Sequence, residues 1–350
     1  MSLTIEKNVS LSELTTLKIG GEARFFAAAT DENQIVEALD FADKSNLKTF
    51  ILGGGSNVLI SDEGFGGLVL QIALKGISTF AENGKTVNLS VGAGEDWDSF
   101  CEFCVGKNLQ GVECLSGIPG LIGGTPVQNV GAYGQEVSGM IITVRCFDRK
   151  SAEFVELTNA ECGFAYRTSI FNTSEKNRYI VTAVTFALRP GGEPNIVYKD
   201  LREFFGDKTP TLPETRQAVL RIRAAKSMVI NAADPNSKSA GSFFKNPIVT
   251  REKYTEIENR AKLSGIESVP FFKADAENVK IPAAWLIENS GFDKGHRRGT
   301  VGLSTKHTLA IVNFGGAAAK DILELKSEIQ AKVKKIFGVE LLPEPIFVGF

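Results

Sequence analysis

Apolar residues recur at helical spacing in two stretches near the ends of the chain. Residues 31–46 place Ile35, Ala38, Leu39 and Ala42 on one face, and Asp31 and Gln34 stand at capping-box spacing at the start. Residues 318–337 place a second apolar row on one face and end at Gly338. The members of this row are Ile322, Leu325, Ile329, Val333 and Ile336. Both stretches predict amphipathic helices that pack on a core.

A second pattern, of short apolar runs and strict alternation, predicts several strands in the first half of the chain. Alternation is clearest over residues 141–147 and 179–188, and shorter runs cover residues 49–52, 68–72 and 86–91. Asn83-Gly84 predicts a hairpin turn between two strand-like runs. A helix is expected over residues 96–107, between these strands. Since helices and strands do not alternate regularly, the first half is predicted to be α+β rather than a βαβ succession.

The segment from Arg189 to Pro194, rich in Gly and Pro, is the strongest sign of a domain boundary. Beyond it we expect a helix from Pro213 to about residue 226 and a polar connector over residues 231–239. Helices over residues 250–263 and 283–289 and a strand over residues 308–313 should follow. The expected parts are a first region over residues 1–190, a connecting segment over 191–228 and a C-terminal α+β domain over 229–350. The first region should contain two α+β subdomains, of about 1–72 and 73–190.

Composition and charge exclude several kinds of partner. The 350 residues include 39 Lys and Arg against 41 Asp and Glu, which gives a formal charge of -2. That balance produces no field to gather nucleic acid or an anionic membrane. The N-terminus lacks the basic start and apolar run of a secretory signal, and no stretch approaches the length of a membrane span. Five cysteines, an odd number, indicate reduced thiols. We expect a cytoplasmic monomer that acts on a small molecule.

Glycine is unusually frequent, with 35 residues that cluster in the first half. The clusters fall at residues 53–55, 92–94, 117–124 and 131–134. Glycine adopts positive φ and lets the main chain approach a ligand closely. The first half is therefore predicted to hold something flat or phosphorylated against its backbone.

Two familiar motifs in this half have simpler explanations. Cys101 and Cys104 form a C-x-x-C, but they share a predicted helical face with Trp97 and Phe100, which favours a place in the core over a redox or zinc site. Gly92-Ala93-Gly94 follows a strand, as in a Rossmann fingerprint. Trp97 occupies the position of the third glycine, so a Rossmann dinucleotide site is not expected.

The segment over residues 116–134, SGIPGLIGGTPVQNVGAYG, points more strongly to a ligand. It is dense in glycine, apolar and almost free of charge. Such a run could be a packed corner between domains. As a ligand loop, its backbone N–H groups could hold a diphosphate while its apolar residues face a flat ring, and this interpretation is favoured.

This segment and several others together resemble the UDP-N-acetylenolpyruvoylglucosamine reductase family, known as MurB. The matching pieces are TLKIGG from Thr16, GGGSN from Gly53, residues 116–134, YRTSIF from Tyr166 and GSFFKNP from Gly241, and they run in the family's order. Trp285 to Ile287 and the C-terminal Pro343-Glu344 and Val348-Gly349 complete the set. The resemblance implies an α+β fold with an FAD-binding domain of the vanillyl-alcohol-oxidase (PCMH) type and a C-terminal substrate-binding domain. It also implies non-covalent FAD and NADPH, and a role in making a cell-wall precursor, UDP-N-acetylmuramate, from UDP-N-acetylglucosamine-enolpyruvate.

Carried onto this chain residue by residue, the resemblance assigns three groups of site residues. Ser242 would protonate the substrate, and Arg167 and Glu344 would flank its carboxylate. Tyr198, on a loop over the substrate, would hold the UDP part with Lys226 and Asn246. Asn289 stands where the family often has Gln, with Glu288 before it, and either of the two could contact the substrate. The implied FAD contacts are Gly53, Gly54, Gly55, Ser56, Asn57, Ser116, Gly117, Pro119, Gly123, Gly131, Ala132, Tyr133 and Gly134.

The chemistry of the residue types agrees with these roles. Hydride addition to an enolpyruvyl ether leaves negative charge that spreads into the neighbouring carboxylate, and Arg167 offers a charged bidentate donor for those oxygens. Glu344 would either be protonated or orient Arg167. Ser242 could instead cap a turn, as serine often does, and Lys245 lies close enough in sequence to assist it. Lys226 and Arg223 could equally belong to a solvated helix face.

Two other functions are compatible with parts of this pattern. A flavin oxidase of the same FAD fold often tethers its cofactor through histidine, but His296 and His307 both lie beyond the first half. A non-catalytic protein that binds a UDP-sugar or flavin would have no need for Arg167, Ser242 and Glu344 together.

Overall fold

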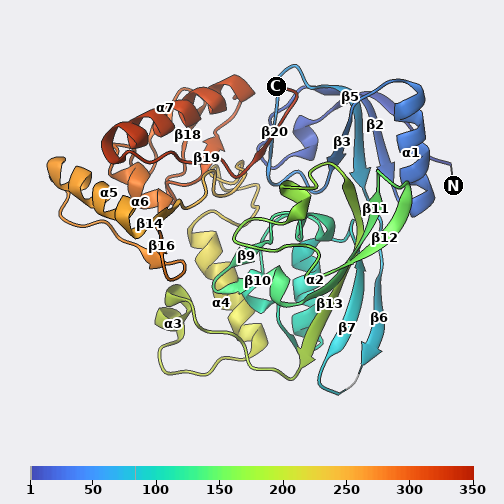
Figure 1. Cartoon of the computed structure of the whole chain (residues 1–350), viewed down its shortest axis with the longest axis horizontal. Helices are drawn as coiled ribbons and strands as arrows, with labels where there is room; N and C mark the ends of the chain where they lie inside the picture. Colours follow the sequence, from blue (N-terminus) through green and yellow to red (C-terminus); the bar gives the residue numbers. More distant parts are fainter. Residues whose placement is uncertain (1, 83) are drawn as a thin grey trace. The chain divides into compact units, whose positions relative to one another are not determined.

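A computed structural model describes residues 2–82 and 84–350, and the chain folds into two units (Figure 1). The first unit contains the N-terminal residues to Val9, Ala23–Gly55 and Gly66–Val229. The second contains Ser10–Glu22, Ser56–Phe65 and Ile230–Phe350. The units therefore divide differently from the boundaries expected from sequence, because two short N-terminal segments join the C-terminal unit and the connecting segment over 191–228 joins the first.

Two sheets form the frame of the first unit. One has the order β1-β2-β5-β3, with β3 and β5 parallel. Buried side chains of this sheet and of α1 belong to the same apolar core. The other has β12, β11, β13, β7 and β6 in that order, with β8 added to β13. The bounds are β1 Glu6–Ser10, β2 Glu22–Ala29, β3 Thr49–Leu52, β5 Phe65–Ile72, β6 Ile77–Glu82, β7 Val87–Gly92, β8 Leu109–Gln110, β11 Ile141–Asp148, β12 Glu153–Thr158 and β13 Tyr179–Pro190.

Helices and a small ribbon complete this unit. The ribbon of β9 (Gly131–Ala132) and β10 (Gln135–Glu136) is antiparallel. The α-helices are α1 Glu32–Lys44, α2 Trp97–Gly106, α3 Lys199–Phe205 and α4 Leu212–Ala225. Short 3-10 helices lie at η2 Glu113–Leu115, η3 Ile122–Gly124, η4 Val137–Gly139 and η5 Ile170–Asn172.

The predicted elements of the first unit are confirmed, with small differences. Asp31 caps α1 by accepting from Gln34 N, but the Gln34 side chain accepts from Thr30 N rather than closing a capping box. Strands β6 and β7 pair antiparallel around the expected hairpin, whose Asn83 lies outside the described residues. In α2, Cys101 and Cys104 are fully buried in the core, and burial raises the pKa of both thiols. The core interpretation of the C-x-x-C is therefore confirmed.

The second unit packs its elements around the long helix α7. Its α-helices are α5 Arg251–Leu263, α6 Ala283–Glu288 and α7 Ala319–Phe337, and its 3-10 helix is η1 Ser12–Leu14. The strand groups are β14-β16-β15, β17-β18-β19 and the parallel pair of β20 and β4. Bounds are β4 Val58–Ile60, β14 Ile248–Thr250, β15 Phe272–Lys273, β16 Asn278–Lys280, β17 Arg297–Arg298, β18 Val301–Leu303, β19 Ile311–Asn313 and β20 Ile346–Val348.

The predicted apolar face of α7 is buried, with Ile322, Leu325, Ile329 and Val333 fully inaccessible. Burying each such side chain stabilises the fold by about 1.5–3 kcal/mol. Gly338 adopts φ 68° and ends the helix as expected. The strand expected over 308–313 is shorter, because residues 307–310 form a turn in which Ala310 N donates to His307 O.

Long-range contacts explain why N-terminal segments belong to this unit. Asp62 accepts hydrogen bonds from Ala319 N (2.7 Å) and Lys320 N (3.2 Å), so it satisfies the free N–H groups at the start of α7. Asn313 donates to Leu17 O, and β4 pairs along β20. These partners lie more than 250 residues apart in sequence, beyond the reach of a local pattern.

Candidate active site

The glycine clusters of the first unit come together in space. A Cβ atom added to Gly54 would lie 2.8 Å from Gly120 Cα, and one added to Gly123 would lie 2.8 Å from Ala93 Cβ. Gly123 N also donates to Ala93 O at 2.9 Å. Three of the clusters found in the sequence therefore pack backbone to backbone, and side chains at Gly54 and Gly123 would force them apart.

The turn after β3 presents free backbone donors at this junction. The N–H groups of Gly53, Gly54 and Gly55 make no hydrogen bond to any of the residues that the structure describes. A Cβ added to Gly53 would have no atom within 4 Å, so the main chain there faces open space. Successive unpaired N–H groups in a glycine turn form a concavity that favours an anion such as a diphosphate. The residues present therefore fit the diphosphate of FAD.

An ion pair fixes the start of the 116–134 segment. Asp98 of α2 accepts from Gly117 N at 2.6 Å and from both terminal nitrogens of Arg216 on α4. Burial raises the pKa of Asp98, but the hydrogen bonds from Arg216 and Gly117 outweigh it and leave that pKa below its usual value. Asp98 is thus a carboxylate at neutral pH, and it anchors Gly117 at φ 73°. No local pattern in the sequence indicates this pair, because its members are 118 residues apart.

The far end of the same segment meets the residues assigned to the UDP part. The ring of Tyr133 lies edge-to-face with that of Tyr198, with centroids 5.5 Å apart. Lys226, the C-cap of α4, pairs with Asp200 at 2.6 Å. Burial lowers the pKa of Lys226, but the hydrogen bond that its ammonium group donates to Asp200, together with nearby groups, raises that pKa above its usual value. Two aromatic rings and an ammonium group therefore lie along one edge of this unit.

Arg223 does not belong to a plain solvated face. Arg223 donates from Nη2 to Met228 O at 2.7 Å, while its buried Nε finds no partner in the described part of the chain. That nitrogen lies 3.3 Å from the position a Cβ on Gly117 would take. These contacts contradict the solvated-face alternative for Arg223, whereas the Lys226 side chain is 41% exposed and its pair with Asp200 is compatible with such a face.

The YRTSIF segment forms a tight turn that presents Arg167. Arg167 has φ 54°, and Asn172 Nδ2 donates to its carbonyl oxygen at 3.2 Å. Its Nη2 donates to Gly131 O at 2.7 Å, so the guanidinium lies against the glycine-rich segment. Ser169 caps the following η5 with a complete capping box. The YRTSIF turn thus holds Arg167 in an uncommon backbone conformation beside Gly131.

In the second unit the GSFFKNP segment is fixed by backbone bonds to the C-terminal segment. Phe243 N donates to Leu309 O, and Phe243 O accepts from Glu344 N at 2.9 Å. Lys245 N donates to Leu342 O, and Phe244 bridges to Pro343. The rings of Phe243 and Phe244 are buried and lie edge-to-face, 5.4 Å apart. This short ladder brings Ser242 and Glu344 to the same end of one rigid element.

Ser242 itself has no structural task among the residues described. Its hydroxyl makes no hydrogen bond to them, and no helix begins there. The alternative that Ser242 caps a helix or turn is therefore not supported. Gly241 before it adopts φ 70°, and Ser242 is half-buried.

The GGGSN segment divides between the units. Gly53 to Gly55 belong to the first unit, whereas Ser56 and Asn57 belong to the second. Asn57 Nδ2 donates to Glu344 O at 3.3 Å, and Asn57 O accepts from Ile346 N at 3.0 Å. Asn57 therefore fixes the main chain of Glu344, a contact that the assigned FAD role did not anticipate.

Asn246 and Asn289 are both tied to α6. Asn246 Oδ1 accepts from Ala283 N at 2.8 Å, which satisfies a free donor at the start of the helix. Asn289 is the C-cap and donates its Nδ2 back to Trp285 O at 2.8 Å. Each side chain thus spends one polar atom on the helix, and the two residues mark its opposite ends.

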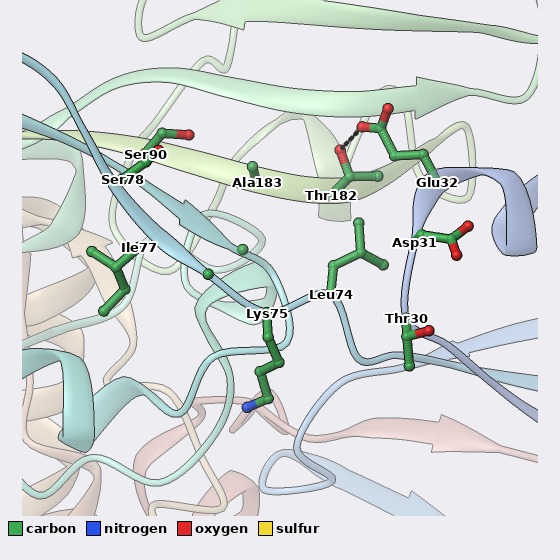
Figure 2. A pocket seen from close by; sticks show the side chains of 12 residues that line it. Thr30, Asp31, Glu32, Leu74, Lys75, Ile77, Ser78, Ser90, Thr182 and Ala183 are labelled. Atoms are coloured by element: carbon green, nitrogen blue, oxygen red, sulfur yellow. Dashed lines mark hydrogen bonds between the residues drawn. The ribbon is translucent and has the colours of Figure 1, made fainter. Parts of the chain in front are cut away.

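A hollow of about 430 Å³ lies elsewhere in the first unit, between the start of α1 and β6, β7 and β13. Figure 2 shows Glu32 turned to Thr182 on its wall. Glu32 also pairs with Arg145, and Asp31 caps α1, so both carboxylates are already engaged. None of the assigned site residues lines this hollow. The polar chemistry lies at the glycine junction instead.

Metal chemistry has no visible support. Within residues 2–82 and 84–350, no group of three or more His, Cys, Asp or Glu side chains could hold a metal ion. In the same ranges, no helix is both long and apolar enough to cross a membrane.

Comparison with known proteins decides the family. The model of the UDP-N-acetylenolpyruvoylglucosamine reductase C-terminal domain matches residues 234–348, and the FAD binding domain model matches residues 23–157. A reductase of that name from Thermobifida fusca is 43% identical, with 100% of this chain and 99% of the relative covered. The chain belongs to the UDP-N-acetylenolpyruvoylglucosamine reductase family. One from Streptomyces coelicolor is also 43% identical, with coverage of 97% of this chain and 89% of the relative.

A solved structure agrees with this family. The UDP-N-acetylenolpyruvylglucosamine reductase of Thermus caldophilus superposes with a TM-score of 0.67 at 26% identity, over 99% of each chain. The expected class, an α+β protein with an FAD-binding domain ahead of a C-terminal domain of this reductase family, is confirmed.

Proposed function

We propose that this enzyme reduces UDP-N-acetylglucosamine-enolpyruvate to UDP-N-acetylmuramate, with electrons from NADPH and a proton from Ser242. Its family supports the reaction, and the free glycine donors of the first unit support FAD as the cofactor. The enzyme would work as a cytoplasmic monomer on a small molecule, without a nucleic-acid or membrane partner.

The residues that would hold FAD follow from the glycine junction. Gly53, Gly54 and Gly55 would offer unpaired N–H groups to the diphosphate, and the apolar residues of the 116–134 segment would face the ring. Bound there, the reduced flavin supplies the hydride. Asp98 keeps Gly117 in place during this contact, because its carboxylate is itself fixed by Arg216.

Arg167 would stabilise the charge that develops on the substrate carboxylate. Its guanidinium is always charged and planar, and the bond from Nη2 to Gly131 O limits its freedom. A donor fixed before the reaction costs no reorganisation when the charge appears. Glu344, fixed through its own main chain by Phe243 and Asn57, would serve the same carboxylate either as a protonated donor or by orienting Arg167.

The assignment of Ser242 as the proton donor rests on the hydrogen bonding of its hydroxyl group. Its hydroxyl has no acceptor among the described residues, while the backbone around it is fixed on both sides. A hydroxyl that is positioned but unengaged is free to give its proton to a strongly basic carbon. Lys245, three residues on, would ease the transfer through its positive charge.

Tyr198, Lys226 and Asn246 would bind the UDP part of the substrate, and Asn289 would also contact the substrate. Lys226 pairs with Asp200, so a diphosphate would either replace the Asp200 carboxylate or share the Lys226 ammonium group with it. Asn246 keeps its Nδ2 group available, since only Oδ1 is engaged by Ala283 within the described ranges.

Separate half-reactions test the role of Ser242. Ser242→Ala should accept electrons from NADPH at the normal rate, but its reduced flavin should be reoxidised by the enolpyruvyl substrate ~10²–10⁴-fold more slowly. Ser242→Cys, which keeps an acidic proton, should recover part of the rate. The exposed serine at the end of α5 gives a matched control, Ser264→Ala, which should behave as wild type. Equal reoxidation rates in Ser242→Ala and wild type would remove Ser242 from this role.

A further inference from the structure

Glu113 is a buried carboxylate that the proposed chemistry does not use. It is fully inaccessible in η2, and no ion pair among the described residues includes it. Burying a charged group without compensation costs several kcal/mol. Three donors compensate it: Gly111 N at 2.8 Å to Oε2, and Gln135 Nε2 at 2.7 Å and Asn195 N at 3.2 Å to Oε1. The carboxylate therefore joins η2 to two distant parts of the chain, at Gln135 and at Asn195.

The first of these parts is the end of the glycine-rich segment. Gln135 directly follows Gly134, and its Oε1 accepts from Cys114 N at 2.9 Å while its Nε2 donates to Glu113. Both ends of the Gln135 amide are thus fixed by neighbouring residues of η2. Since β10 pairs with β9, this contact sets the position of the turn that carries Tyr133.

The second part is the segment that carries Tyr198. Asn195 donates its N–H to Glu113 and accepts from Cys114 Sγ at 3.4 Å. Its main chain is therefore held at both polar groups, three residues before Tyr198. Within the segment, Ile196 packs on the apolar cluster that includes Cys114 and Leu201, whereas Val197 is 57% exposed and Tyr198 41% exposed.

The two parts meet at the tyrosines. Tyr133 and Tyr198 lie edge-to-face, and a Cβ added to Gly134 would lie 2.5 Å from Val197 Cγ2. This fit depends on the register of one segment against the other. The Glu113 side chain is bonded to both segments, to Gln135 on one side and Asn195 on the other, and the neighbouring Cys114 bonds to the same two residues.

We propose that Glu113 is a positioning residue, which holds the Tyr198 segment in register with the glycine-rich turn so that Tyr198 can bind substrate. The inference rests on the proposed role of Tyr198. It adds a buried group that acts through Asn195 and touches neither substrate nor flavin.

A pair of substitutions separates the two links. Glu113→Gln replaces one carboxylate oxygen by an amide donor, which then faces N–H groups that need an acceptor. In the exchanged double variant Glu113→Gln/Gln135→Glu, the amide of residue 113 can donate to the new carboxylate, which still accepts from Cys114 N. The NH₂ group of the new amide at residue 113 then occupies the position of the former Oε1, and it cannot accept a hydrogen bond from Asn195 N. The exchange thus restores the side-chain hydrogen bond between residues 113 and 135, and it leaves the Asn195 N–H without its acceptor on residue 113.

The expected kinetics follow from those bonds. Glu113→Gln should raise KM for the enolpyruvyl substrate ~10-fold or more and weaken FAD binding, since it leaves buried N–H donors without an acceptor. The exchanged variant should bind FAD within ~2-fold of wild type but keep the raised KM, with kcat much less affected. In a Tyr198→Ala background, Glu113→Gln should add little to KM. Glu153→Gln, on an exposed strand position of the same unit, should change nothing.

Two results would overturn the inference. One is a normal KM in the exchanged variant; the other is an equal further rise in KM when Glu113→Gln is combined with Tyr198→Ala. Hydrogen exchange of the backbone amides over residues 195–205 provides a readout that needs no substrate. It should be faster in both Glu113 variants than in wild type and Glu153→Gln, and unchanged exchange would also refute the inference. If wild type does not turn over the substrate, the proposed function fails while this exchange test still stands.

Discussion

Alanine at Gly53 separates a contact with cofactor from a contact within the protein. Neither Gly53 nor its neighbour Gly54 has positive φ, so both backbones accept alanine. A Cβ on Gly53 meets no atom within 4 Å, whereas one on Gly54 lies 2.8 Å from Gly120 Cα, about 0.6 Å short of ordinary contact. Gly53→Ala should therefore leave the apo-protein as stable as wild type, and Gly54→Ala should destabilise it by about 1–3 kcal/mol.

Gly53→Ala, which should leave the stability of the apo-protein unchanged, should weaken the binding of FAD. If the diphosphate lies against Gly53, the added methyl occupies space that the ligand needs, at a cost of about 1–3 kcal/mol, or ~5–150-fold in Kd. Flavin fluorescence titration of the apo-protein measures this Kd, and thermal unfolding measures the apo-protein's Tm. Gly66→Ala is the matched control, because its Cβ also meets nothing within 4 Å and it lies in β5. If Gly53→Ala bound FAD as tightly as wild type and Gly66→Ala, the cofactor would not lie on this turn.

Three further predictions extend to charge and cofactor. Arg167→Lys, which keeps the charge but loses the planar fork, should lower kcat/KM ~10²-fold or more in steady-state assays, and an unchanged value would remove Arg167 from the carboxylate. Arg178 lowers the pKa of Asp148 to about 2, so their pair contributes fully above the unfolded pKa of about 4 and is lost as pH falls toward 2. The Tm difference between wild type and Asp148→Asn should therefore shrink over that window, and a constant difference would contradict this. FAD should be released completely when the holoenzyme is denatured in acid, whereas flavin that stayed with the protein would indicate a covalent oxidase.

The sequence predicted local structure well because local structure depends on nearby residues. The apolar faces of α1 and α7 and the alternation of β11 and β13 are periodic signals that their own burial enforces. The glycine clusters likewise indicated a ligand-ready backbone, since an excess of glycine has few other uses. That Gly54 would pack on Gly120 could not be predicted, because contact between two loops depends on the whole sheet arrangement.

The contacts that hold the site were largely hidden from sequence. Asp98, Arg216 and Glu113 are ordinary residue types at ordinary helical positions, and their partners lie between 2 and 118 residues away. Nothing in the local pattern distinguishes them from solvated charges. Their burial and bonds mark them only once the chain is folded.

Division of the chain into units was also beyond local reasoning. Gly and Pro at 189–194 favoured a boundary there, yet Gly191 N donates to Asn108 O and the following residues stay with the first unit. The parallel pairing of β4 with β20 draws Ser56–Phe65 into the second unit. Pairing across nearly the whole chain leaves no mark on composition.

Reoxidation of the reduced flavin by the enolpyruvyl substrate is the step on which the proposed function depends. Bound FAD would be reduced by NADPH without oxygen, freed of excess NADPH, and mixed with UDP-N-acetylglucosamine-enolpyruvate in a stopped-flow instrument. We expect rapid return of the oxidised flavin absorbance and formation of one UDP-N-acetylmuramate per flavin. A flavin that stays reduced after the substrate is added would contradict the proposed function.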